Sequence, residues 1–172
     1  GDSSGYYEAF RLLARMYGSL GQHARAKAWE TYAGKFRRRA NAASFNGTFY
    51  RHRVPLVPGS VDGVDEEAQL TLSNPMDINR GLADHAQAVS ILREYQRRRA
   101  STRAFAEWFS IDPPFPDGVF GDERLVAGAY VNGGILPLVG GELARAAFEH
   151  GFETYGIDIL ERYYAMASVV PS

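Results

Sequence analysis

The carboxylates best placed for acid–base chemistry are Glu142 and Asp77. Glu142 follows a glycine-rich segment and begins a helix that should point into a cavity, where a carboxyl group can exchange a proton with a substrate. Asp77 and Arg80 are three residues apart, so on a helix they share one face and suit an ion pair that grips a polar substrate. Each has a structural alternative, since Glu142 could complement the helix dipole and the Asp77–Arg80 pair could lock a kink. We predict Glu142 and Asp77 as catalytic residues, with Arg80 binding the substrate.

Aromatic rings and amides gather in segments that should be loops. Sugars present hydroxyl groups beside weakly apolar C–H faces, so a sugar site needs carboxylates, amides and arginines next to exposed aromatic rings. A Gly-Gly pair lets the backbone approach a ligand, or forms a plain turn. The loop aromatics could instead plug the loops onto the core. The predicted substrate-binding residues are Arg80, Tyr130, Asn132, Gly133, Gly134, His52 and Trp108.

The four histidines show no metal-ligand spacing. His23, His52, His85 and His150 form no pair at i, i+4, and the chain has no cysteine, so we predict neither a metal site nor a thiolate nucleophile. Nucleotide-binding and serine-hydrolase fingerprints are also absent from the sequence, and no cofactor is expected. His52 lies between two arginines and is the histidine that we expect to contact a substrate.

Composition excludes several classes of protein. The chain has 172 residues, 45% of them hydrophobic and 23% charged, which is typical of a globular domain. Its net charge of −1 supplies no bulk attraction to phosphate backbones, so we expect no nucleic-acid partner. No apolar run reaches the roughly 18 residues of a membrane span, so we expect no membrane partner. The first residues resemble neither a signal peptide nor a natural start, and we expect a piece of a longer chain.

Apolar periodicity predicts an all-α fold built from helical hairpins. Breakers at Gly18–Gly21, Gly81 and Gly151 should form the short turns, and Asp84 should cap a helix. A short β-hairpin is possible over residues 45–52, around Asn46-Gly47. The helical segments expected are 6–20, 23–40, a segment from Asp65 interrupted at Asn74-Pro75, 84–99, 141–150 and 157–167, with long loops over 41–64 and 101–140.

The hairpins repeat. Arginine triplets begin 60 residues apart, at Arg37 and Arg97, and close two helices in equivalent places. The connecting loops are too long and too aromatic for a solenoid, whose units stack directly on one another. A toroid fits better, in which inner and outer helices alternate and the long loops gather over one end. We therefore predict that residues 1–172 form one partial domain, with three of six hairpins.

Residues 130–137 (YVNGGILP), followed by GELA at 141–144, resemble the six-hairpin glycosidases, whose (α/α)6 barrels often carry an aromatic-Asn-Gly-Gly-x-x-Pro stretch before an inner helix. Residues 74–84 (NPMDINRGLAD) are similar to the inner-helix ends and turns of that superfamily. Leu136 departs from the pattern, because many relatives have tryptophan there. The resemblance implies a carbohydrate substrate, hydrolysed at the mouth of the barrel, usually with inversion. It also implies a missing upstream half, which could supply one of the two carboxylates that inversion requires.

Two other functions stay open. A sugar epimerase or isomerase on the same toroid would use cavity-facing histidines as proton carriers, and His52 and His150 would have to converge. A non-catalytic helical-repeat binding module would have short loops, which the 101–140 segment argues against.

Overall fold

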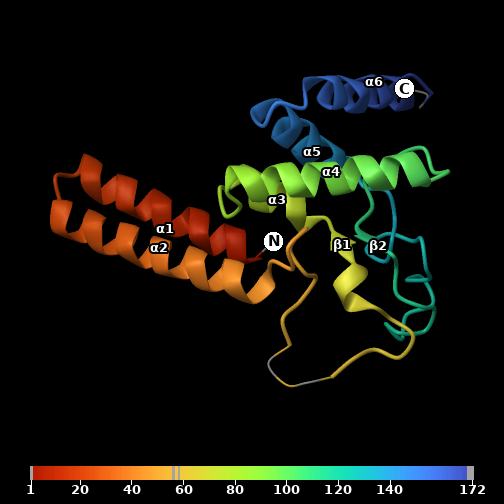
Figure 1. Ribbon diagram of the computed structural model, residues 1–172, viewed down its shortest axis with the longest axis horizontal. Coiled ribbons are helices and arrows are strands. Elements are labelled where there is room, and N and C mark those ends of the chain that lie inside the picture. Colours follow the sequence, from red (N-terminus) through yellow and green to blue (C-terminus); the bar gives the residue numbers. More distant parts are fainter. Residues whose placement is uncertain (1, 56, 58, 170–172) are drawn as a thin grey trace.

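The computed structural model describes residues 2–55, 57 and 59–169. Within these ranges six α-helices dominate and one small two-stranded sheet is present, which confirms the all-α prediction (Figure 1). None of these helices is both long enough and apolar enough to cross a membrane. The elements in chain order are α1 (Asp2–Ser19), α2 (His23–Ser44), the 3-10 helix η1 (Glu66–Ala68), β1 (Leu70–Thr71), α3 (Ser73–Asn79), α4 (His85–Ser101), β2 (Ile111–Asp112), α5 (Pro137–Glu149) and α6 (Glu153–Val169).

Helices α1 and α2 form the first predicted hairpin, which projects away from the other helices (Figure 1). Gly21 makes the turn with φ +70°, a left-handed conformation that glycine adopts without strain. Phe10 of α1 stacks on Trp29 of α2 and meets Phe36 edge to face, with ring centroids 5.7 and 5.5 Å apart. Helix α2 runs to Ser44, four residues past the predicted end, because Asn41, Ala42 and Ala43 are compatible with a helix.

The middle hairpin is less regular than predicted. Asp84 caps α4 as expected. The backbone N–H of Gln87 donates to the Asp84 carboxylate at 2.8 Å, and the side-chain oxygen of Gln87 accepts from the backbone N–H of Asp84 at 3.0 Å. The acidic run after Asp65, in contrast, forms only the 3-10 turn η1, and α3 begins later, at Ser73. Pro75 lies in the first turn of α3, where its missing N–H costs no helical hydrogen bond.

Helices α5 and α6 form the third hairpin, in which α5 packs against α3 and α4 and α6 packs against α5 (Figure 1). Helix α5 begins at Pro137, earlier than the predicted Gly141, since proline at the first helical position already has a helical φ. Helix α6 begins at Glu153, inside the segment expected to be a turn. The core gathers under these helices, around Leu92 and Tyr95 of α4, Leu143 of α5 and Ile159 of α6.

The sheet joins the two long loops. Leu70 of β1 pairs with Asp112 of β2, and Thr71 with Ile111, in antiparallel register. Residues some 40 positions apart in the chain thus form the ladder, which local sequence patterns did not predict. The predicted hairpin over residues 45–52 is present as a single antiparallel bridge between Phe45 and Tyr50.

Two buried ionic clusters tie loops to helices. Arg162 of α6 donates to the Glu107 carboxylate at 2.7 Å, and the Tyr155 hydroxyl also donates to that carboxylate. Arg98 of α4 pairs with Glu94 at 2.8 Å and with Asp112 at 2.6 Å. The second arginine triplet therefore has a structural role through Arg98, since a buried guanidinium requires such partners.

Trp108 is the largest fully buried side chain. Its ring stacks on Tyr163, with centroids 4.7 Å apart, and the Arg162 guanidinium lies 4.9 Å from its centroid. Gly140 of α5 closes the remaining side, because a Cβ there would lie 2.6 Å from the indole ring. Trp108 belongs to the core, so the prediction that it stacks on a substrate is wrong.

Gly140→Ala should therefore destabilise the protein. The added methyl overpacks the indole, which typically costs about 1–3 kcal/mol, and this outweighs or cancels the gain in helix propensity of roughly 1 kcal/mol. The matched control is Gly141→Ala, the next residue of α5, whose Cβ would stay 3.6 Å from the nearest atom, the Tyr163 hydroxyl. Urea unfolding should give Gly140→Ala a free energy of unfolding about 1–3 kcal/mol below that of Gly141→Ala. Equal values for the two variants would contradict this packing.

Candidate functional site

Both long loops contribute to one cavity of about 570 Å³. The first loop supplies residues 50–54, and the second supplies Phe115, Phe120 and Val131. The floor is formed by Asp77 of α3 together with residues of the β1–β2 region. A cavity of this size accommodates a small ligand such as one or two sugar rings.

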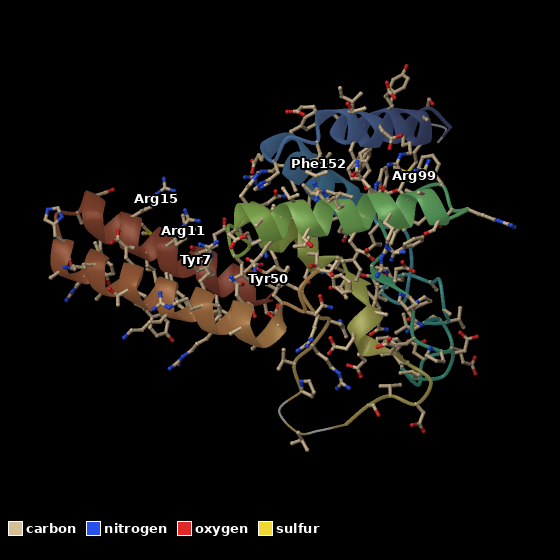
Figure 2. All side chains as sticks on the ribbon, viewed as in Figure 1. Tyr7, Arg11, Arg15, Tyr50, Arg99 and Phe152 are labelled. Atoms are coloured by element: carbon tan, nitrogen blue, oxygen red, sulfur yellow. The ribbon has the colours of Figure 1, made fainter. Side chains whose placement is uncertain are left out.

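Two buried asparagines hold the cavity's aromatic residues by the same pattern. Asn74 of α3 accepts from the Tyr50 N–H at 2.8 Å and donates to the Tyr50 carbonyl at 3.1 Å. Asn132 accepts from the Phe115 N–H at 2.8 Å and donates to the Phe115 carbonyl at 3.0 Å. Each asparagine amide makes the two hydrogen bonds that a neighbouring β-strand would make to Tyr50 or Phe115. The N–H and carbonyl groups of these two residues are therefore satisfied while their rings line the cavity. Tyr50 lies where the α1–α2 hairpin meets the other helices (Figure 2).

Ser110 joins the second loop to the sheet. Its carbonyl accepts from the Leu72 N–H at 2.9 Å, and its N–H donates to the Gly134 carbonyl at 2.8 Å. Its hydroxyl donates to the Tyr130 carbonyl at 2.8 Å and accepts from the Gly133 N–H at 2.9 Å. Ser110 lines the cavity and positions the Asn-Gly-Gly segment behind the cavity wall.

Asp77 is the buried carboxylate of the cavity, with 3% of its surface exposed. Burial raises the pKa of Asp77, against the opposing effects of a hydrogen bond with Ser4 and the positive charge of Arg80. The main-chain carbonyl of Asp77 accepts from Leu82 and Ala83, so the turn after α3 fixes the residue. This carboxyl group can hold a proton beside a ligand and release it during a reaction.

His52 and two phenylalanines form the aromatic side of the cavity. The His52 ring meets Phe115 edge to face at 5.7 Å, and Phe115 meets Phe120 in the same way at 5.4 Å. Desolvation of the ring lowers the pKa of His52 and Arg53 lowers it further, against the opposing charge of Glu66. At neutral pH His52 is therefore an uncharged hydrogen-bonding group. Phe120 is 43% exposed, which leaves its ring available to a ligand.

The arginines on either side of His52 are paired. Arg51 donates to Glu67 at 2.7 Å, and Arg53 makes a two-pronged contact with Glu66, with both distances 2.7 Å. These pairs neutralise the charge of the rim. The lining thus combines two carboxyl groups, of Asp2 and Asp77, with hydroxyls, aromatic edges and arginines that are paired with glutamates.

Glu142 lies elsewhere. It lines a second, shallower pocket with Tyr163 and Arg145, while Asp77 lines the large cavity. Its carboxylate accepts from the side-chain amide of Asn79 at 2.5 Å, so α3 carries Asp77 and contacts Glu142 through Asn79. The structure gives the two predicted catalytic residues separate pockets.

The other predicted binding residues have structural contacts. Arg80 contacts α1 through Glu8 at 3.4 Å and Ser4 at 3.3 Å, as expected of a side chain that locks the turn. Tyr130 is 69% exposed and does not line the cavity, although its neighbour Val131 does.

The Asn-Gly-Gly residues have structural roles. Asn132 is buried, and its side chain is occupied by its hydrogen bonds with the Phe115 backbone. Gly134 must be glycine, because a Cβ there would lie 2.6 Å from the Tyr130 backbone, and Gly133 has φ +98°. These residues shape the loop behind the cavity, and of the predicted site residues Asp77 and His52 line the cavity itself.

Sequence reasoning missed several cavity residues. In the sequence, Tyr50 and Phe115 are simply two of the loop aromatics, and Ser110 carries no signal beyond being polar. The same holds for Asn74, which bonds the Tyr50 backbone without lining the cavity itself. A polar side chain before a proline, as in Asn74-Pro75, is ordinary at a helix start. Its role emerges only from the loop that passes over it.

No protein-family model matches this chain, and no curated protein matches it. Within the described ranges, no group of three or more His, Asp or Glu side chains is arranged to hold a metal ion.

Asp77→Asn should stabilise the protein at neutral pH. The raised pKa means that folded Asp77 binds a proton more tightly than the unfolded chain does, so its contribution to stability is present below pH 3.8 and is lost as pH rises through the folded pKa. The asparagine variant lacks this loss. Urea unfolding from pH 3 to pH 8 should show a free energy of unfolding that exceeds the wild-type value at pH 7 and converges with it at low pH.

Asp122→Asn provides a control of opposite sign. Its hydrogen bonds from Arg124 lower the pKa of Asp122, so the same substitution should not raise stability at pH 7. An Asp77→Asn variant that is less stable than wild type at pH 7 would contradict the assignment of Asp77 as a carboxyl group disfavoured in its charged form.

Proposed function

We propose that this chain is the carbohydrate-binding and catalytic part of an (α/α)6 glycoside hydrolase, with three of the six hairpins of its barrel, that the complete barrel cleaves glycosidic bonds in the cavity between this chain's long loops, and that the chain alone is inactive. The observation that carries the proposal is the meeting of two loops, far apart in the sequence, around a buried carboxyl group with a raised pKa. The resemblance of residues 130–144 to the six-hairpin glycosidases supports the same function.

Asp77 suits the general acid. Protonation of the glycosidic oxygen requires a carboxyl group that still carries its proton near neutral pH, and burial favours that state. The acid would donate to the leaving oxygen while a second carboxylate, roughly 6.5–9.5 Å away, activates a water molecule on the opposite face of the sugar. The further hairpins of the barrel would supply that second carboxylate. The proposal thus gives the acid to this chain, whereas the resemblance more often implies the base.

The aromatic edge of the cavity suits the apolar face of a sugar ring. Phe120 offers an exposed ring that Phe115 buttresses from behind, and His52 offers an uncharged nitrogen for a hydroxyl group. The paired arginines leave little excess charge at the rim, which favours neutral sugars over charged ones. Glu142 stands outside this cavity, so in the proposal it supports α5 and does not exchange the proton.

The alternative functions fit less well. An epimerase needs His52 and His150 to converge, but His52 lines the cavity while His150 contacts His85 at another place. A helical-repeat module needs short connections between hairpins, whereas α4 and α5 are separated by residues 102–136.

Phe120→Ala should weaken sugar binding by about 5- to 10-fold, since an aromatic contact contributes roughly 1–1.4 kcal/mol. Isothermal titration of the chain with neutral trisaccharides measures this change. Phe105→Ala is the matched control, because Phe105 is similarly exposed, at 46% against 43%, but packs against Trp108 and does not line the cavity. Equal affinities for the two variants would exclude Phe120 as a binding residue.

Asp77→Asn should lower kcat on aryl glycosides by about 10² or more in a protein that carries the whole barrel, because the amide cannot deliver a proton. Glu142→Gln should change kcat by much less, since Glu142 lies in the second pocket. The reverse ranking would move the catalytic centre to Glu142, and wild-type rates in both variants would reject both residues.

A further inference from the structure

Helix α1 carries an exposed apolar stripe. Leu12, Met16 and Leu20 follow one another at four-residue spacing, which places them along one side of the helix, and all three are exposed. Together with Arg15 and Ser19 they line a shallow hollow of about 430 Å³. The Arg15 side chain projects from the side of α1 that faces away from α2 (Figure 2). The hollow is therefore apolar with one cationic edge.

Helix α6 carries a second exposed stripe. Ile157, Leu160 and Tyr164 share one side of the helix, whereas Ile159, on the other side, is buried in the core. Tyr164 is 79% exposed, and Glu161 is exposed beside it. A surface helix normally presents polar residues to water, so apolar residues on both sides of α6 indicate a surface that another molecule covers.

The hairpins that carry the two stripes have opposite charges. Residues 2–44, which form α1 and α2, contain eight Lys and Arg against three Asp and Glu, a net charge of +5. Residues 137–169, which form α5 and α6, contain two arginines against five Asp and Glu, a net charge of −3. Complementary charge of this kind steers association and determines which surfaces meet.

We propose that these stripes bind a second copy of this chain, with α6 of one copy packed on α1 of the other. Tyr164 would enter the hollow on α1 and contact Met16, since thioethers pack favourably on aromatic rings and tyrosine is a common interface anchor. Glu161 lies three residues before Tyr164 on the same side of α6, so it would face Arg15 at the edge of the hollow. Among the residues that the structure describes, neither Arg15 nor Glu161 has an ion-pair partner within its own chain.

The dimensions and positions of the stripes suit this pairing. At 1.5 Å per residue, the stripe from Leu12 to Leu20 is about 12 Å long and that from Ile157 to Tyr164 is about 10 Å long. Helices α1 and α6 lie towards opposite ends of the molecule's longest axis (Figure 1). A two-fold axis between the copies would therefore form the α1–α6 contact twice in one closed dimer. Neither stripe lines the large cavity, so the dimer goes beyond the proposed function and does not depend on it.

Sedimentation velocity of the chain, from about 1 µM to about 1 mM, tests for the dimer. We expect a concentration-dependent dimer that Tyr164→Ser weakens about 10-fold or more, because the substitution removes the ring that fills the hollow. Tyr130→Ser is the matched control, since Tyr130 is also exposed but belongs to neither stripe, and this variant should dimerise like wild type. Circular dichroism checks that both variants keep the helical content of the wild type.

Exchange of the charges identifies the two surfaces. Arg15→Glu and Glu161→Arg should each weaken dimerisation about 10-fold or more, because like charges then face each other in both contacts. An equimolar mixture of the two variants should dimerise again, since each contact in the mixed dimer pairs opposite charges. Lys27→Glu changes the net charge as Arg15→Glu does, but Lys27 does not line the hollow, and this control should dimerise like wild type.

Four results would overturn the proposal. They are a wild-type chain that stays monomeric at about 1 mM, a dimer that survives Tyr164→Ser, a mixture of the charge variants that fails to pair, and a monomer whose binding to vesicles of anionic lipid is lost in Arg15→Glu. The last would assign the α1 stripe to a membrane surface instead. None of these results bears on sugar hydrolysis, which the Asp77 and Phe120 variants test separately.

Discussion

The structure depends on how two long loops bury their backbones. A buried N–H or carbonyl without a partner costs about as much as a lost hydrogen bond, and these loops have little regular structure to supply partners. The side chains of Asn74 and Asn132 bond the backbones of Tyr50 and Phe115. Ser110 bonds the backbone on both sides of it, at Leu72 and at Gly134. Because these three residues satisfy the backbone hydrogen bonds of the loops, the aromatic rings of the loops can line a cavity.

Buried charged groups, like the buried backbone, also require partners. Glu107 lies in a fully covered position and is compensated by Arg162, with Tyr155 donating a third contact, while Arg99 approaches at 3.8 Å from the carboxyl end of α4 (Figure 2). Arg98 similarly gathers Glu94 and Asp112. Asp77 differs, because burial outweighs its compensation and raises its pKa. Glu107 and Glu94 are thus surrounded by cationic partners, whereas at Asp77 the effect of burial on the pKa exceeds that of the neighbouring groups.

Local signals predicted the helices better than the site. Asp84 and Gln87 are the two residues of a capping box and lie three positions apart, within one turn of helix, and Gly21 and Gly151 mark turns in the same local way. The site was predicted from residue type, and type does not determine which way a side chain faces. Trp108 and Asn132 have the chemistry of sugar-binding residues, yet the first is enclosed by Tyr163 and Gly140 and the second by the Phe115 backbone.

The sequence by itself determined the helical class, the hairpins and the cap at Asp84, because these depend on periodicity and turn chemistry along a short stretch of chain. Tertiary structure alone decided that Glu142 faces a separate pocket, that β1 pairs with β2, and that His85 meets His150. These are contacts between residues some 40 to 65 positions apart. Their partners are selected by how helices and loops pack in space, and no pattern within a single segment encodes that choice.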